Sequence, residues 1–364
     1  MKSVQTRIVI SGYYGCGNTG DEAVLAGILE SFRQTVGEEK TSFTVLSAKP
    51  EETLKQHGVA AAPRMDRSAR LKALESADLF LSGGGSLLQD TTSLRSLVYY
   101  LWVVREAYRK QVPVVYYAQG IGPLNRGVSR FLTRIVTNRA SLVTVRDSDS
   151  AELLKKIGVN RPKIEVTADP AFVLRSEADD RIDALQYAAG IKKGEKLIGI
   201  AVRNWSGVPK TFWRESVQLI SAETGCTPLF LPMQPPGDLE LSEFAANGLG
   251  HVIQDPFTPA EAIGLLARCD ALIAMRLHAL IFGAVAGVPV IGASYDPKVE
   301  SLMKILGQSE QCHGIAELTP QTLLEQVKYA LQNSQIENIS LNKSVQHLSI
   351  RALDNARLAL AEAK

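Results

Sequence analysis

Short apolar runs alternate with longer amphipathic segments along most of the chain, and this alternation predicts the secondary structure. A run of about four to eight apolar residues between polar turns is typical of a buried strand, whereas apolar residues three or four positions apart indicate a helix. In the first half the predicted strands are 7–11, 42–47, 79–82, 114–119, 142–146 and 164–167, and the predicted helices are 22–36, 51–57, 68–76, 96–110, 128–138 and 148–157.

A polar stretch at 175–195, predicted as a short helix and a linker, separates this series from a second one. The predicted strands are 197–202, 227–231, 251–253, 271–274 and 288–292; the predicted helices are 210–224, 238–249, 258–268, 280–286, 300–306, 319–333 and 340–363, the last with Ser340 as its N-cap.

Strand–helix alternation of this kind predicts an α/β protein with parallel sheets covered by helices on both faces. We expect two Rossmann-like domains with a cleft between them, an architecture like that of the glycosyltransferase-B fold. The expected parts are an N-terminal domain (1–175), a linker (176–195), a C-terminal domain (196–335) and a final helix (336–364) that packs back on the N-terminal domain.

Composition narrows the possible functions. The 364 residues are 45% hydrophobic and carry a net charge of only +2. The sequence contains no basic run with interleaved aromatic residues, so nothing in it indicates nucleic-acid binding. The four cysteines lie far apart, so we predict no metal site and a reducing compartment. The first strand enters a glycine turn, unlike a signal peptide, and no apolar run reaches the ~18 residues of a membrane span. We expect a cytoplasmic protein.

The candidate chemistry centres on Arg276, His278 and Lys298. Arg276 and His278 follow a predicted strand where the next helix begins, and Lys298 follows the next strand. In open α/β sheets the carboxyl ends of strands bind ligands, and helix N-termini attract anions. Arg276 as a surface charge and His278 as a helix cap are the alternatives, but three such residues on one edge favour an anion site.

Glycine-rich turns after three strands of the first half form a second group of candidates. The first resembles a dinucleotide-binding loop, but its two acids at a helix start would repel a pyrophosphate, so an N-cap, a first-turn acid or contacts to sugar hydroxyls fit better. Consecutive glycines in the second turn allow either close approach to a ligand, which we favour, or relief of crowding. The candidates are Gly15, Asn18, Asp21 and Glu22 in the first turn, Gly83, Gly84, Gly85, Gln89 and Asp90 in the second, and Gln119 in the third.

Two arginines and an aspartate follow other strands. Arg146 is suited to bidentate binding of a carboxylate or phosphate. A salt bridge between Arg146 and Asp147 is the structural alternative, which adjacent residues rarely form well. Asp169 follows a strand in the first half, and Arg203 repeats the strand-then-arginine pattern in the second.

Seven motifs in one order resemble those of the polysaccharide pyruvyl transferases, and most closely the CsaB-type enzymes that pyruvylate secondary cell-wall polymers of surface-layer-bearing bacteria. They occupy 12–22, 83–90, 117–123, 145–148, 168–172, 276–280 and 294–299. The resemblance implies transfer of an enolpyruvyl unit from phosphoenolpyruvate to an N-acetylmannosamine on a lipid-diphosphate-linked precursor, forming a 4,6-linked pyruvate ketal. Phosphoenolpyruvate is then a co-substrate, and no cofactor is needed.

The resemblance also places donor-site residues at Arg146, His278 and Lys298. From the chemistry of the reaction we assign His278 as the general acid and add Arg276 and Arg203 to the donor-binding cations. Asp21, Glu22 and Asp169 remain candidates for the base or charge stabiliser, and the glycine turns for acceptor contacts. A lipid-linked acceptor would bring the protein to the inner face of the cell membrane without an anchor of its own.

Two other functions are compatible with the sequence. A nucleotide-sugar-dependent glycosyltransferase of the same fold needs a ribose-binding acid in the second half, and none is evident after Arg276. A non-catalytic cell-wall glycan-binding protein needs aromatic platforms, whereas aromatic residues make up 6% of this chain. Neither alternative explains Arg146, His278 and Lys298 together.

Overall fold

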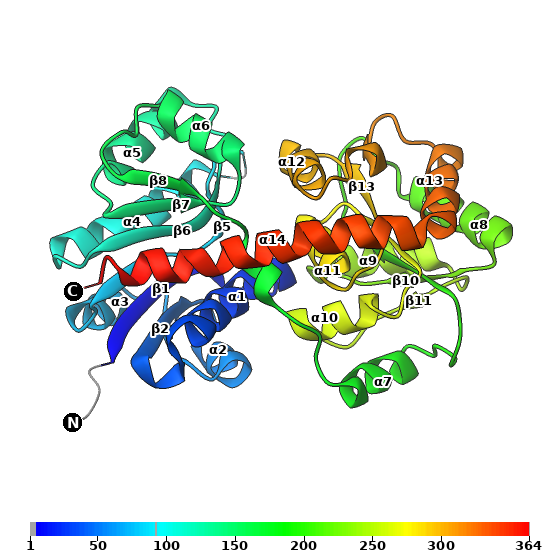
Figure 1. Cartoon of the computed structure of the whole chain (residues 1–364), viewed down its shortest axis with the longest axis horizontal. Coiled ribbons are helices and arrows are strands. Elements are labelled where there is room, and N and C mark those ends of the chain that lie inside the picture. Colours follow the sequence, from blue (N-terminus) through cyan, green and yellow to red (C-terminus); the bar gives the residue numbers. More distant parts are fainter. Residues whose placement is uncertain (1–4, 92, 364) are drawn as a thin grey trace. The chain divides into compact units, whose positions relative to one another are not determined.

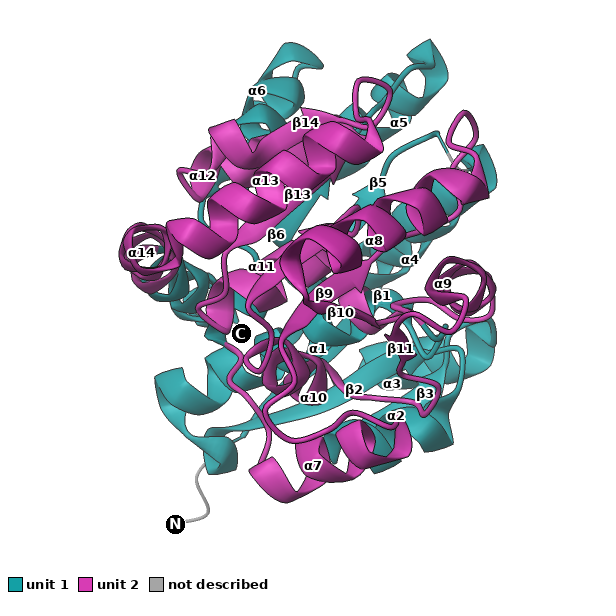
Figure 2. Cartoon of the chain, turned by 90° about the vertical axis from the view of Figure 1, so that its right-hand side faces the viewer, with its two compact units in different colours: residues 1–17, 21–173, 348–364 teal, residues 18–20, 174–347 magenta. Residues whose placement is uncertain are grey.

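The computed structural model describes residues 5–91 and 93–363, which form two compact units, each built on a parallel sheet (Figure 1). Unit 1 contains the described residues up to Gly17, Asp21–Val173 and those from Leu348 onward. Unit 2 contains Asn18–Gly20 and Leu174–His347, and Figure 2 colours the two units separately. The predicted α/β class with two Rossmann-like sheets is confirmed.

The sheet of unit 1 has the strand order β3-β2-β1-β4-β6-β7-β8, with β5 paired to β6, and its described pairs are all parallel. The order reverses between β1 and β4, so their carboxyl ends are where an open α/β sheet binds ligands. The bounds are β1 (Thr6–Tyr14), β2 (Thr41–Ser47), β3 (Ala60–Pro63), β4 (Leu79–Ser82), β5 (Gly85–Leu88), β6 (Val114–Ile121), β7 (Leu142–Val145) and β8 (Lys163–Val166).

Alternate residues of these strands point into two different cores. Phe80 and Tyr116 pack with one set of helices, including α4 and α6, whereas Leu81 and Tyr117 pack with α1 and the end of the last helix. This double burial explains the continuous apolar runs in the sequence. The helices are α1 (Thr19–Val36), α2 (Pro50–His57), α3 (Arg67–Glu75), α4 (Leu94–Arg109), α5 (Gly127–Thr137) and α6 (Ser148–Lys156).

The sheet of unit 2 repeats the same scheme, with the order β11-β10-β9-β12-β13-β14 and a reversal between β9 and β12. Its strands are β9 (Leu197–Ala201), β10 (Thr227–Phe230), β11 (His251–Val252), β12 (Ala271–Ala274), β13 (Val290–Ser294) and β14 (Cys312–Gly314). Its helices are α7 (Asp179–Ala188), α8 (Lys210–Thr224), α9 (Gly237–Ala246), α10 (Pro259–Leu266), α11 (Leu277–Val285), α12 (Pro297–Ile305) and α13 (Pro320–Gln332).

The last helix, α14 (Ser334–Leu360), returns the chain to unit 1, as predicted. Asn355 is fully buried there, and its Oδ1 accepts hydrogen bonds from the hydroxyls of Thr144 (2.5 Å) and Thr167 (2.7 Å). Ala356 and Ala359 pack in the same core as β1 and β6. The end of α14 is therefore an integral part of unit 1.

Several predicted elements are wrong in detail. Ser340 is not the N-cap of the last helix, which begins at Ser334 and leaves Ser340 exposed in its interior. The strand predicted at 288–292 begins at Val290, because Pro289 has no N–H to donate to the ladder. The strands β3, β5 and β14 were missed, since β3 is a run of alanines, which have low strand propensity, and β5 starts at a glycine that indicates a turn.

Within the described ranges, none of the helices combines the length and the apolar content that a bilayer span requires.

Candidate functional site

Three cationic residues of unit 2 follow three neighbouring parallel strands. Arg203 follows β9, Arg276 follows β12 and Lys298 lies in the first turn after β13. The strand register pairs Ala274 with both Ala201 and Gly292, so these carboxyl ends meet at one edge of the sheet, at the point where the strand order reverses. We name Arg203, Arg276, His278 and Lys298 the cationic rim.

Arg276 is held by Asp238 from the start of α9. Its Nε donates to Asp238 Oδ2 (3.0 Å) and its Nη2 to Oδ1 (2.6 Å), a bidentate pair that buries the carboxylate. The remaining Nη1 donates to Gln234 Oε1 (3.2 Å). Asp238 therefore fixes the direction of the guanidinium and offsets part of its charge. This partner was not found from the sequence, because Asp238 lies 38 positions from Arg276, at the start of a predicted helix.

Arg203 lies against two aromatic rings. Its Nη1 donates to the hydroxyl of Tyr295 (3.1 Å), and its guanidinium lies 5.1 Å from the Tyr295 ring centre and 5.4 Å from that of Trp205. Its Nε is buried and makes no hydrogen bond within residues 5–91 and 93–363. A buried N–H without an acceptor costs free energy, so this donor is suited to an anionic or polar ligand.

Lys298 and His278 complete the cationic rim. Lys298 Nζ lies 3.2 Å from Asp296 Oδ2, and Asp296 is also the N-cap of α12. His278 is the second residue of α11, near the positive end of that helix, and its ring is half-buried. The N-cap of α11 is Arg276, so the alternative in which His278 caps the helix is wrong. Gly20, which belongs to unit 2, lies so close to the His278 ring that a side chain there would collide with Nδ1.

In unit 1, Arg146 is almost fully buried in an ion-pair cluster. Its Nη1 lies 3.0 Å from Asp169 Oδ2, its Nε lies 3.6 Å from Asp147 Oδ2, and its Nη2 donates to Ser86 Oγ (3.2 Å). The expectation that Asp147 would not pair with Arg146 is therefore wrong: Asp147 both caps α6 and contacts Arg146. Gly120 provides the room, since a Cβ there would lie 2.7 Å from the guanidinium.

The two acids of the first glycine turn differ in environment. Glu22 is buried, accepts a hydrogen bond from the Gly15 N–H (2.8 Å) and contacts His57 Nε2 (3.0 Å), so it holds the turn in shape. Asp21 is half-exposed, and its carboxylate lies beside Gly85 of the second glycine turn.

The helix α1 begins at Thr19, so Asp21 and Glu22 both lie in its first turn. Just before the helix, Asn18 Oδ1 accepts a hydrogen bond from the Gly20 N–H (2.9 Å).

The second and third glycine turns contribute mainly to structure. A side chain at Gly83 would collide with the Tyr14 hydroxyl, and one at Gly84 would meet Val24 at 2.8 Å, so relief of crowding explains both glycines. Gln119 is fully buried, and its Nε2 donates to the Ser82 carbonyl (3.0 Å).

Asp90 and Gln89 bind the chain around them. Asp90 accepts backbone N–H bonds from Asn125 and Arg126 (2.8 Å each). Burial opposes ionisation of Asp90, but these bonds outweigh it and lower the pKa of the carboxyl group. Gln89 Oε1 accepts from the Thr91 N–H (2.8 Å) and hydroxyl (2.6 Å).

A cluster around Arg64 was not found from the sequence. The Arg64 guanidinium lies 4.9–5.6 Å from the ring centres of Tyr13, Tyr99 and Tyr100, and it donates to the Tyr100 hydroxyl (3.2 Å) and to Cys16 Sγ (3.6 Å). Arg64 follows β3, which the apolar pattern missed. The cluster borders the first glycine turn and exposes part of the Tyr13 ring, a surface suited to stacking on a sugar.

Among the described residues, no three His, Cys, Asp or Glu side chains gather in an arrangement that could hold a metal ion.

Comparison with known proteins identifies a matching family and a curated relative. The family model described as "Polysaccharide pyruvyl transferase" matches residues 18–297. One curated relative is "Amylovoran biosynthesis protein AmsJ" of Erwinia amylovora, 22% identical over 388 aligned positions that cover 90% of this chain and 92% of that protein.

Solved structures share the fold at low sequence identity. Anabaena HepE in complex with UDP-glucose has a TM-score of 0.65 at 15% identity, covering 98% of this chain and 99% of HepE. A putative UDP-N-acetylglucosamine 2-epimerase from Listeria monocytogenes has a TM-score of 0.65 at 13% identity, covering 96% and 94%. A glycosyltransferase from Rickettsia africae has a TM-score of 0.63 at 9% identity, covering 98% and 97%.

Proposed function

The chain belongs to the polysaccharide pyruvyl transferase family, and we propose that it transfers the enolpyruvyl unit of phosphoenolpyruvate to a sugar diol, forming a pyruvate ketal and releasing phosphate. The observation that carries the donor is the cationic rim, which gathers Arg203, Arg276 and Lys298 at the strand-order reversal of unit 2. Phosphoenolpyruvate carries a phosphate and a carboxylate, so several fixed cations and two helix N-termini match its charge.

The reaction needs a proton at the methylene carbon and a nucleophile at the central carbon of the donor. We assign the proton to His278, the rim residue that can act as an acid near neutral pH. One sugar hydroxyl attacks the central carbon and forms the first ketal bond. The second hydroxyl then attacks the same carbon as phosphate leaves, which forms the second ketal bond and breaks the carbon–oxygen bond to phosphate. In the net reaction, one of the two hydroxyl protons is accounted for in the new methyl group, and the other leaves with phosphate.

Environment favours Asp21 as the base among the three acids. Glu22 and Asp169 are buried, with 8% and 3% of each residue exposed, so a sugar hydroxyl does not reach either carboxylate. Asp21 is half-exposed at the carboxyl end of β1, beside the loop that follows β4, which is the ligand edge of unit 1. We assign Asp169 to holding Arg146, and Arg146 to donor binding, the role that the resemblance implies.

For the acceptor we propose a lipid-diphosphate-linked precursor that carries N-acetylmannosamine, as in the CsaB-type enzymes. The similarity to a protein named for amylovoran biosynthesis supports a polysaccharide precursor as the class of acceptor. Such an acceptor would place the reaction at the cytoplasmic face of the membrane.

The decisive experiment incubates the protein with phosphoenolpyruvate and a synthetic lipid-diphosphate aminosugar disaccharide, and follows the acceptor by mass spectrometry and the phosphate by colour assay. A donor-dependent mass gain of one pyruvyl ketal with equimolar phosphate release supports the proposal. Consumption of a nucleotide sugar instead would replace it with glycosyl transfer.

The acid is tested with His278→Ala, and the exposed His347→Ala serves as a matched control. His278→Ala should lose about two orders of magnitude or more in kcat while equilibrium dialysis still detects bound phosphoenolpyruvate. Full activity of His278→Ala would remove His278 from the mechanism.

A further inference from the structure

The outer surface of α4 and α5 carries apolar side chains where a water-exposed helix normally carries polar ones. We name this surface, formed by Val98, Trp102, Val128, Phe131 and Ile135, the apolar face. Their exposed fractions are 42%, 39%, 49%, 52% and 46%. The two helices pack side by side, since the Tyr108 hydroxyl of α4 donates to the Val136 carbonyl of α5 (3.0 Å). The five residues therefore lie on two neighbouring helices of unit 1.

The helix α5 buries hydroxyls while it exposes large apolar side chains. Its buried side contains Val136 but also Ser129, Thr133 and Thr137, whereas Phe131 and Ile135 face outward. Folding alone favours the opposite arrangement, because burying an apolar side chain gains about 1.5–3 kcal/mol and burying a hydroxyl gains none. The outward apolar side chains thus indicate a surface that leaves water when a partner binds.

Arginines surround the apolar face. From Leu94 to Arg139 the sequence contains eight basic residues and one acidic residue, Glu106, so this segment carries +7 while the whole chain carries +2. Glu106 is buried and paired with Arg70, so it adds no negative charge to the surface. Seven exposed arginines within the segment form no ion pair with a described carboxylate: Arg95, Arg105, Arg109, Arg126, Arg130, Arg134 and Arg139.

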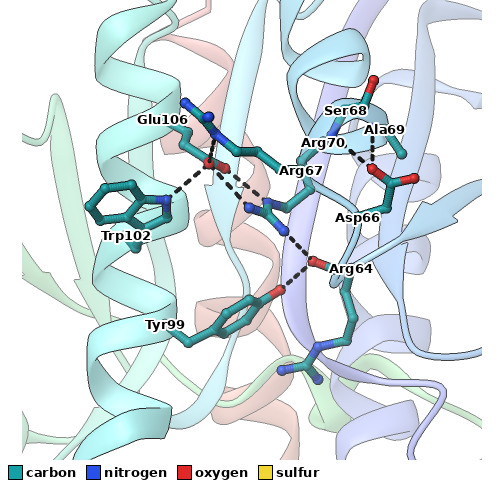
Figure 3. A network of polar contacts seen from close by, with 9 residues as sticks. All are labelled: Arg64, Asp66, Arg67, Ser68, Ala69, Arg70, Tyr99, Trp102 and Glu106. Carbon is teal, nitrogen blue, oxygen red and sulfur yellow. Dashed lines mark hydrogen bonds and ion pairs between the residues drawn. The ribbon is translucent and has the colours of Figure 1, made fainter.

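Trp102 is fixed in the middle of this arrangement. Its Nε1 donates to Glu106 Oε1 (3.0 Å), and the same carboxylate receives Arg70 from α3 (Figure 3). The guanidinium groups of Arg105 and Arg109 lie 5.8 Å and 5.2 Å from the Trp102 ring centre.

A largely apolar hollow of about 420 Å³ lies beside the Trp102 ring. It is lined by Leu94, Arg95, Val98, Tyr99 and Trp102.

We propose that the apolar face and its arginines bind the surface of an anionic lipid bilayer. Tryptophan and aliphatic side chains enter the region between headgroups and acyl chains, while arginines contact the phosphates above them. A second copy of this chain is a poorer partner, because a symmetric contact would bring seven arginines on each side together without acids to match them. An uncharged apolar ligand leaves the arginines without a function.

This inference does not rest on the proposed reaction, because lipid binding is measured without turnover. The purified full chain is mixed with vesicles of phosphatidylcholine alone or of phosphatidylcholine with phosphatidylglycerol, and the bound fraction is measured by co-flotation. We expect binding to the anionic vesicles only, weakened by high salt.

Two pairs of substitutions separate the apolar and the charged contributions. Phe131→Ser with Ile135→Ser, and Arg130→Glu with Arg134→Glu, should each lower the vesicle partition coefficient by about tenfold or more. The control substitutions Ile350→Ser and Arg357→Glu lie at exposed positions on α14 and should leave binding unchanged. Circular dichroism of each variant verifies that it is folded.

Three results would overturn the proposal. They are equal binding to neutral and anionic vesicles, binding that survives both pairs of substitutions, and a dimer in sedimentation equilibrium that Phe131→Ser with Ile135→Ser dissolves while vesicle binding is absent. If the protein binds vesicles but forms no ketal on a lipid-linked acceptor, that result contradicts the proposed function and leaves the membrane-binding proposal standing.

Discussion

Arg276 donates from two of its nitrogens to Asp238, and only Nη1 remains directed elsewhere. A guanidinium held in this bidentate way cannot rotate, which fixes the geometry that it offers to an anion. The pairing also lowers its net attraction for a ligand. Asp238 thus has two opposite effects on anion binding by Arg276: it orients the guanidinium, and it offsets part of its charge. A single substitution of Asp238 separates the two effects.

We predict that Asp238→Asn raises the KM for phosphoenolpyruvate about tenfold with a smaller effect on kcat, because hydrogen bonds to a charged group contribute about 1.5–3 kcal/mol to holding it. Steady-state kinetics measure the split, and Asp255→Asn, an exposed aspartate of the same unit, is the control. An unchanged or lower KM would mean that Asp238 only competes with the donor for Arg276.

Glu195 links pH to stability in unit 2. Its burial opposes ionisation, but hydrogen bonds from Thr227, the Lys192 N–H and His251 outweigh it and lower the pKa of Glu195 to about 2. His251 Nδ1 also lies 3.0 Å from the Ala189 carbonyl oxygen, which fixes the ring beside Glu195. Because the folded pKa lies below the unfolded one, this stabilisation is complete above about pH 4.3 and is lost as the pH falls toward 2.

We therefore expect Glu195→Gln to lower the free energy of unfolding by about 1 kcal/mol at pH 7 and by progressively less below about pH 4. Urea unfolding across this pH range measures the difference from the unsubstituted protein. Glu51→Gln on α2, where the side chain is exposed, should show no such trend. A deficit that is constant with pH would assign the effect to packing rather than to the charge.

At the residue scale, sequence reasoning located side chains better than it identified their partners. Strand ends mark where Arg146, Arg203 and Arg276 lie, because parallel strands and their following turns are local patterns. The partners Asp169 and Asp238 are 23 and 38 positions away along the chain, and no local pattern encodes such a distance. The same limit hid the cluster around Arg64.

Among the elements, α3 and α4 are joined by a buried ion pair. Arg70 Nε lies 2.9 Å from Glu106 Oε2, both side chains are almost inaccessible, and Trp102 and Arg67 also contact the carboxylate (Figure 3). Removing one member of such a pair leaves an uncompensated buried charge, which costs more than the pair itself contributes.

Glu106→Ala should accordingly destabilise the protein by about 3–5 kcal/mol, measured by urea unfolding. The double substitution Arg70→Met with Glu106→Leu should recover most of that loss, because it removes both charges and keeps the volume filled. If the double variant is as unstable as Glu106→Ala, the pair contributes through specific geometry instead.

The spacing of apolar residues predicts where helices and strands lie. It does not predict where they begin and end, because their ends depend on local contacts. The strand β4 and the helix α8 have the predicted bounds, since turn residues flank each of them. In contrast, α14 begins six residues before its predicted cap, Ser340, because a serine on an exposed helix face has the same local signature as one at a helix start.

On the scale of the whole molecule, unit 1 is assembled from segments that lie at opposite ends of the sequence. The residues from Leu348 onward close one face of its sheet: Ala356 and Ala359 pack against the core of β1 and β6. Asn355 satisfies the buried hydroxyls of Thr144 and Thr167. Without this segment the two hydroxyls keep only their longer bonds to strand carbonyls (3.3 Å and 3.2 Å), and apolar surface of the sheet meets water.

A fragment ending at residue 173 should therefore not fold stably, whereas the same fragment joined to 348–364 through a flexible linker should, since the joined chain restores both the core and the hydrogen bonds. Urea unfolding followed by circular dichroism compares the two. In the joined fragment, Asn355→Leu should cost about 2–4 kcal/mol, because it removes the shorter hydrogen bond of each threonine hydroxyl and the bond from Asn355 Nδ2 to the Ala168 carbonyl. Asp354→Asn on the outer side of the helix should cost little. A cooperative transition of equal stability for the short fragment would show that the residues up to 173 hold the sheet together without α14, and the helix end would then be a covering element rather than part of the fold.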